Sequence, residues 1–226
     1  MSNPSSDSVE FDPDVIRGAV PRSRRNRWNR TISPRDGEQA IYLDFEGTKR
    51  DPVCLVGVND RLDGEWRLRQ WAFDPALQTA AKAGSGDVDV WDPDSFVDWL
   101  VDRSERHGAK VIAWTEYDML VLLYVRPQIT LRFRNARKSA IRWDRNQGID
   151  LEGGLQAHLE HVGYHRSPEV VSGAGHWIRT IRERVKSDWE DVSRGGMEAW
   201  RRLVAHNATD LEGMATYVRA RGEPPA

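Results

Sequence analysis

Hydrophobic and polar residues alternate along three consecutive short segments, residues 41–45, 52–58 and 65–73. A period of two residues is typical of strands that bury one face. Asp63-Gly64 lies between the second and third segments, and this dipeptide favours a tight reversal of the chain. The pattern therefore predicts an antiparallel meander of three strands.

After residue 90 the hydrophobic period changes to that of a helix. Phe96, Val97, Leu100 and Val101 share one face of a helix that begins near Asp92. The remaining apolar segments predict further strands at 110–114 and 129–133, and helices at 116–124, 151–163, 177–186 and 197–219. This order predicts an α/β fold whose mixed sheet has five strands, the meander plus parallel strands, flanked by helices.

Residues 1–35 are rich in Ser, Pro, Asn and Arg and lack hydrophobic periodicity, which predicts a basic, disordered N-terminal arm. One domain is expected over residues 36–220, followed by a short tail at 221–226. The longest apolar run, near 111–125, is interrupted by Glu116 and Asp118, so neither a membrane span nor a secretory signal is predicted. A single cysteine cannot form an internal disulfide, which fits a reducing compartment, so we expect a cytoplasmic protein.

The formal net charge of −2 hides two basic stretches. Residues 17–35 contain seven arginines and no acidic residue, and residues 126–145 contain seven cations and one aspartate. Such stretches indicate a phosphate-binding surface, or else a solvated surface in an arginine-rich chain; we favour binding for the second stretch and leave the first open. Trp28 could stack on an unpaired base. The residues expected to contact nucleic acid are Arg24, Arg25, Arg27, Trp28, Arg132, Arg134, Arg137 and Lys138.

Acidic residues stand in three of the apolar segments, where an ionised carboxylate is costly unless a cation neutralises it. Asp44 and Glu46 are two residues apart on a predicted strand, so both point to one face. Asp118 lies in the first turn of a predicted helix, and His206 and Asp210 are four residues apart on another. If these elements converge, their oxygens would suit a hard cation such as Mg²⁺ or Mn²⁺.

The order of these motifs resembles that of the DEDD exonuclease superfamily, which has the ribonuclease H-like fold. Asp44 and Glu46 match its first motif, Asp118 its second, and His206 with Asp210 its third. Glu116 is the alternative for the second motif, but the residues around Asp118 match the family's spacing better. The resemblance covers roughly residues 38–218.

Residues 154–164 and the third motif are similar to one branch of this superfamily, the ribonuclease H-like domain of stand-alone nucleases and of proteins with a RecB-type nuclease module. That branch typically has Tyr-Asn-x-x-Asp as its third motif, whereas this chain has His206-Asn-Ala-Thr-Asp210. Histidine can also orient or deprotonate a water, since its unperturbed pKa is about 6.5.

The resemblance implies hydrolysis of phosphodiester bonds with two Mg²⁺ or Mn²⁺ ions. Asp44 would bridge both ions, and Glu46 and Asp210 would complete the site that activates water, which His206 positions. Asp118 would hold the second ion. The implied activity is a 3′→5′ exonuclease on single-stranded DNA or RNA, with a helicase or nuclease as a conceivable protein partner.

Two other functions remain open. The domain could be a catalytically silent nucleic-acid-binding module that recruits such a partner, or an endonuclease specific for branched or hybrid structures. Retention of four costly carboxylates argues against the silent module. The sequence leaves open the choice between DNA and RNA.

Other polar patterns have two interpretations each. His158, His161 and His165 have spacing that could bind zinc, but no additional cysteine completes a set of four ligands, so we favour solvated or hydrogen-bonded histidines. Arg179, Arg182 and Lys186 recur at helical spacing and could either follow a phosphate track or form surface salt bridges.

Overall fold

The computed structural model describes residues 11–84, 88–151, 153–165, 173–185 and 192–222. Within these residues a six-stranded sheet forms the centre of the molecule, in the order β4-β3-β2-β1-β5-β6. The strands are β1 Ile41–Glu46, β2 Leu55–Asp60, β3 Arg67–Ala72, β4 Val88–Val90, β5 Val111–Ala113 and β6 Phe133–Asn135. Strands β1, β2 and β3 pair antiparallel, whereas β1–β5, β5–β6 and β3–β4 pair parallel.

The predicted meander and the mixed α/β sheet are therefore confirmed, including the turn before β3. Gly64 has φ of +93°, which an L side chain rarely adopts, and its N–H donates to the Arg61 carbonyl at 3.0 Å. The prediction of five strands was wrong by one. Strand β4 has only three residues, too few to show a period.

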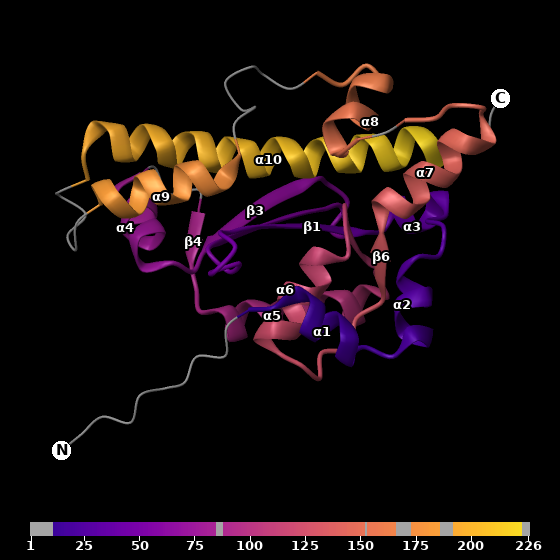
Figure 1. The fold of residues 1–226 in the computed structure, drawn as a ribbon, viewed down its shortest axis with the longest axis horizontal. Helices are drawn as coiled ribbons and strands as arrows, with labels where there is room; N and C mark the ends of the chain where they lie inside the picture. The colour runs from indigo at the N-terminus through magenta and orange to yellow at the C-terminus, as the bar shows by residue number, and fades with distance from the viewer. Residues whose placement is uncertain (1–10, 85–87, 152, 166–172, 186–191, 223–226) are drawn as a thin grey trace.

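Helices cover both faces of the sheet (Figure 1). Their bounds are α1 Pro13–Ala19, α2 Arg22–Trp28, α3 Pro34–Glu38, α4 Pro75–Ala83, α5 Pro93–His107, α6 Tyr117–Val125, α7 Ala136–Asn146, α8 Leu155–His161, α9 Ala174–Arg184 and α10 Arg194–Gly222. The long α10 lies along one face, and α1, α5 and α6 lie on the opposite face. Among the described helices, none has both the length and the apolar character needed to cross a membrane.

Side chains of β1 alternate between the two layers. Ile41, Leu43 and Phe45 pack in the core formed with α5 and α6, whereas Tyr42 packs in the core formed with α10. This alternation turns Asp44 and Glu46 toward α10 as well, because side chains two residues apart share a face.

The N-terminal segment is folded from residue 11 onward, so the prediction of a disordered arm over residues 1–35 was wrong for its larger part. Helices α1, α2 and α3 occupy this segment, and Phe11, Val20, Trp28 and Ile32 are buried. Each helix has only five to seven residues, and their apolar anchors are irregularly spaced, so no period marks them. Residues 1–10 lie outside the described residues.

Two helices and one strand position also differ from the expectation. Helices α4 and α7 were not predicted, and the strand expected at 129–133 is instead β6, Phe133–Asn135. The side chain of Asn135 accepts from the Lys138 N–H and so starts α7 directly after the strand. The buried face of α7 consists of small residues such as Ala136, Ser139 and Ala140, which give a weak hydrophobic signal.

Candidate metal centre

Strand β1 presents two carboxylates to α10. Glu46 is 8% exposed, and Asp44 is partly buried. Their antiparallel partners on β2 are Leu55 for Glu46 and Gly57 for Asp44. The pair therefore lies near the end of a central strand, and both side chains share one face as their spacing predicted.

Helix α6 adds Asp118, which is 5% exposed. Its Oδ1 accepts from the backbone N–H of Phe45 at 3.0 Å. The parallel pairing of β1 with β5 ends at Tyr42 and Ile112, before Phe45. The N–H of Phe45 therefore has no partner on β5 and donates to the Asp118 carboxylate instead. Because β5 is parallel to β1, the helix that follows β5 begins beside the acidic end of β1.

The competing candidate Glu116 is directed elsewhere. Its Oε1 accepts from Nε of Arg17 at 2.7 Å, which ties it to α1. The structure thus favours Asp118 over Glu116 as the acid from this segment.

Helix α10 brings the third motif to the same place. The Nε2 atom of His206 lies 3.6 Å from Oε1 of Glu46 and 4.0 Å from Oδ2 of Asp210. The ring of Trp177, from α9, packs edge-on against the His206 ring with their centroids 5.3 Å apart. The helical spacing of four residues predicted this shared face correctly.

Asn207, which is fully buried, was not among the predicted site residues. Its Nδ2 donates to the Asp44 carbonyl at 3.0 Å and to Oδ2 of Asp44 at 2.9 Å. Its Oδ1 accepts from Nε2 of Gln70 at 2.9 Å, and the same Gln70 nitrogen also donates to the Val204 carbonyl. A neutral amide therefore orients Asp44 and connects β1, β3 and α10.

Gly57 makes this contact possible. A Cβ atom added there would lie 2.0 Å from Oδ1 of Asn207 and 2.4 Å from Cδ1 of Leu211, far inside contact distance. A glycine within an apolar strand often marks a close backbone approach. Together with the asparagine of His206-Asn-Ala-Thr-Asp210, it was a sequence signal that could have pointed to Asn207.

The four carboxylates influence one another's charge. The pKa of Asp44 is raised well above its ordinary value by burial and then by the negative charges of Glu46, Asp118 and Asp210. Burial likewise raises the pKa of Asp118 to about 7. A cluster of this kind favours proton uptake when alone, and a divalent cation would restore its ionised form.

A different group has the tightest spacing of ligand atoms. Among the described residues, the one set of three whose ligand atoms all lie within 4.8 Å is Asp51, Cys54 and Asp74. Nη2 of Arg182 lies 2.5 Å from Asp51, 2.7 Å from Asp74 and 3.3 Å from the Cys54 sulfur. The guanidinium occupies the place of a cation, so Arg182 forms partly buried ion pairs with Asp51 and Asp74 and does not follow a phosphate track.

Ligand atoms of the candidate metal centre are consequently spaced more widely, with no three of the carboxylates within 4.8 Å of one another in the described residues. A single Mg²⁺ holds its ligands at about 2.0–2.1 Å and requires a narrow cage. Two ions about 3.5–4 Å apart distribute their ligands over a wider space. The described carboxylates therefore do not present the close set of three ligand atoms that a single caged ion requires.

Trp28 does not occupy the position predicted for it. Its side chain is 2% exposed and packs edge-to-face against Phe133, with ring centroids 5.7 Å apart. The prediction that Trp28 stacks on a base was therefore wrong, because the ring belongs to the core between α2 and β6.

The two basic stretches pack against each other, and several of their guanidinium groups bind backbone carbonyls. Arg24 donates to the Ile129 carbonyl, Arg134 to the Arg27 carbonyl at 3.1 Å, and Arg142 to the Asn29 carbonyl. The predicted nucleic-acid residues that remain exposed are Arg27, Arg132, Arg137 and Lys138, whereas Arg24, Arg25 and Arg134 are half-buried.

His158 is hydrogen-bonded within the core. Its Nδ1 lies 2.9 Å from Oδ2 of Asp144, and the Tyr217 hydroxyl donates to the same carboxylate. None of the three histidines considered for zinc belongs to a described group of three close ligand atoms. For His158, the structure therefore supports a hydrogen-bonded histidine and not a zinc ligand.

Comparison of the chain with protein-family models, with curated proteins and with solved structures found no match in any of the three. The residues and their geometry are therefore the evidence for function. Foremost among them are the acids that β1, α6 and α10 bring together.

Proposed function

We propose that this chain is a metal-dependent nuclease with a ribonuclease H-like fold. The observation that supports the proposal is the convergence of Asp44, Glu46, Asp118 and Asp210 from three separate elements, close enough for the last three to raise the pKa of Asp44. The sheet agrees with it, since the first strand of the meander is central and pairs in parallel with β5, which in turn pairs with β6.

In the proposed reaction a water oxygen joins phosphorus and one phosphorus–oxygen ester bond breaks. Bound Mg²⁺ or Mn²⁺ ions would supply positive charge for the attacking and leaving oxygens. Asp44, Glu46 and Asp210 would hold the ion on the side of the water, and Asp118 the other. His206, beside Glu46 and Asp210, is placed to orient the water and accept its proton.

The substrate that we propose is single-stranded DNA or RNA, degraded from its 3′ end. The resemblance of the three acidic motifs supports this polarity and substrate. The rival function, a silent module that recruits a helicase or nuclease, makes the opposite prediction for an assay of cleavage.

The test is a time course on labelled single-stranded DNA and RNA with Mg²⁺ or Mn²⁺. Wild type should produce a product ladder, and Asp44→Asn should lose about 1,000-fold or more in rate, because metal ions contribute several kcal/mol of charge stabilisation and each 1.36 kcal/mol is tenfold. The matched control is Asp102→Asn, which changes an exposed acid on α5 and should retain full activity.

Equal cleavage by wild type and Asp44→Asn would contradict the proposal, as would no cleavage by wild type on either substrate. End-blocked and circular substrates separate the two nuclease modes. Their cleavage would assign an endonuclease in place of an exonuclease.

A further inference from the structure

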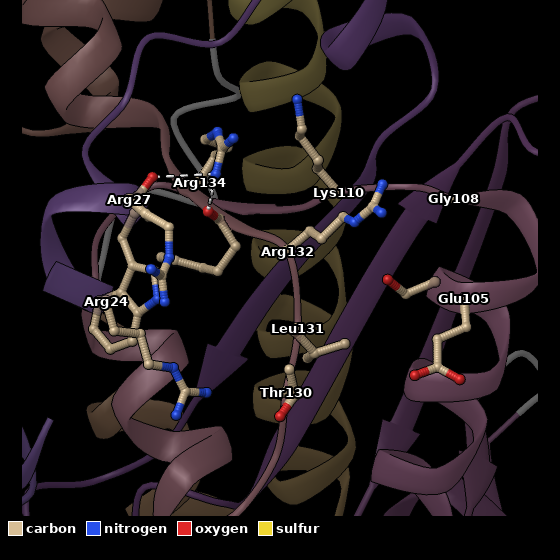
Figure 2. A pocket seen from close by; sticks show the side chains of 12 residues that line it. Arg24, Arg27, Glu105, Gly108, Lys110, Thr130, Leu131, Arg132 and Arg134 are labelled. Atoms are coloured by element: carbon tan, nitrogen blue, oxygen red, sulfur yellow. Dashed lines mark hydrogen bonds between the residues drawn. The ribbon is translucent and has the colours of Figure 1, made fainter. Parts of the chain in front are cut away.

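A basic pocket of about 640 Å³ lies between α2, β6 and the turn from α5 to β5 (Figure 2). Glu105 on α5 is the carboxylate in its lining. The cations of the lining come from α2, from the residue before β5 and from β6 with its preceding residue, and they are Arg24, Arg27, Lys110, Arg132 and Arg134.

Most of this positive charge is not neutralised by protein carboxylates. Lys110 forms an ion pair with Asp36, but no ion pair among the described residues involves the four arginines of the pocket. Two of them do donate hydrogen bonds to backbone carbonyls, Arg24 to Ile129 and Arg134 to Arg27. A carbonyl satisfies a donor without cancelling its charge, so the pocket keeps an excess of positive charge.

The closeness of these cations also affects the pKa values of two of them, Arg24 and Arg134. Burial and then the charge of Arg27 lower the pKa of Arg24. Burial also lowers the pKa of Arg134; the charge of Asp36 opposes this shift, and the charges of Arg30 and Arg132 add to it. An anion in the pocket would relieve this mutual repulsion.

The pocket lies at one end of the edge strand, and the carboxylates lie toward the other. Strand β6 is parallel to β5 and pairs Phe133 with Val111, which places Arg132 at the same end as Lys110. At the opposite end, the N–H of Arg137 donates to the Trp114 carbonyl at 2.9 Å, four residues before Asp118.

Exposed cations continue between these ends. Arg132 is followed by the half-buried Arg134 on β6 and then by the exposed Arg137 and Lys138 in the first turn of α7. Cations therefore occur along β6 and the start of α7, from the pocket toward the end of β5 that precedes α6.

We propose that this pocket binds the phosphodiester backbone of a nucleic acid strand whose cleaved end lies at the carboxylates. The inference rests on the proposed function for the identity of the strand. Guanidinium groups form paired hydrogen bonds with phosphate oxygens, and the repeated phosphates of a strand match a row of cations. The carboxylates of an acidic protein segment can form such pairs as well, so the proposed function selects the nucleic acid strand as the occupant.

The experiment measures fluorescence anisotropy of a labelled single-stranded 20-nucleotide DNA in EDTA, so that no hydrolysis is required. The double variant Arg27→Ala/Arg132→Ala removes two exposed cations of the pocket. It should weaken binding about tenfold and reduce the slope of log K against log salt by about 1.4, since each phosphate contact on a single strand contributes about 0.7. The matched control, Arg202→Ala on α10, should bind as wild type does.

Unchanged affinity in the double variant would overturn the proposal, and so would equal weakening in Arg202→Ala. Competition by polyglutamate as strong as that by unlabelled DNA would also overturn it, in favour of an acidic protein segment. If a mononucleotide binds as tightly as the 20-nucleotide strand, the pocket is a site for small anions, and the proposal that it binds a strand is contradicted.

A cleavage assay distinguishes this inference from the proposed function. With Mg²⁺ present, the double variant should show a raised KM and an unchanged kcat. If wild type cleaves DNA and the double variant still binds DNA normally, the role of the pocket is contradicted and the proposed nuclease function stands. If the double variant binds DNA more weakly but wild type does not cleave it, the proposed nuclease function is contradicted and the role of the pocket stands.

Discussion

Asp44 depends on a neutral neighbour for its orientation. Its carboxylate and its carbonyl both accept from Nδ2 of Asn207, whose own oxygen accepts from Gln70. A metal ligand held by an outer hydrogen-bonding group is positioned before the ion arrives, and such outer groups typically contribute 10–100-fold to affinity or activity.

Asn207→Ala should therefore reduce the cleavage rate by about 10–100-fold. It should also lower the free energy of unfolding by about 1–3 kcal/mol, because Gln70 loses an acceptor in the core. Steady-state kinetics and urea denaturation measure the two effects. The exposed Asn146→Ala, on α7, is the control and should change stability by less than about 0.5 kcal/mol. Full activity in Asn207→Ala would refute its positioning role.

At the scale of residues, the sequence predicted what depends on local spacing. Asp44 with Glu46, and His206 with Asp210, share faces because a strand and a helix have fixed periods. Asn207 and Gln70 could not be paired in this way, since they are 137 positions apart and meet only when α10 packs on the sheet. Trp28 was misplaced for the same reason, because its burial depends on β6.

Among the described elements, α2 differs most from what the sequence predicted. It was expected within a disordered arm, yet it covers the edge strand β6 through the contact of Trp28 with Phe133. Longer elements with a repeated apolar pattern, such as α5 and α10, were predictable, whereas the short α1, α3 and β4 depend on caps and pairing.

Trp28→Ala should lower the free energy of unfolding by about 3–5 kcal/mol, the usual cost of removing a large buried aromatic side chain. Urea denaturation followed by circular dichroism measures this loss. Arg22→Ala, at an exposed position of the same helix, should have an effect below about 0.5 kcal/mol. An unchanged midpoint for Trp28→Ala would restore the hypothesis of a disordered arm.

In the whole molecule, residues from the chain's first fifth, middle and last tenth meet at one end of a central strand. The parallel pairing of β1 with β5 brings Asp118 to Asp44, and the length of α10 allows it to cross the sheet with its polar motif at the centre. The sequence indicated which acids would meet. It did not indicate that the two basic stretches would pack together and form a pocket toward the other end of β5 and β6, because that depends on how α2 docks.

Calorimetric titration of the full chain with Mn²⁺ tests most directly whether the carboxylates form a metal centre. We predict that wild type and Asp102→Asn bind two ions per chain. Asp44→Asn, which loses the carboxylate proposed to bridge the two ions, should bind Mn²⁺ at least about tenfold more weakly. Identical titration curves for wild type and Asp44→Asn would contradict this prediction.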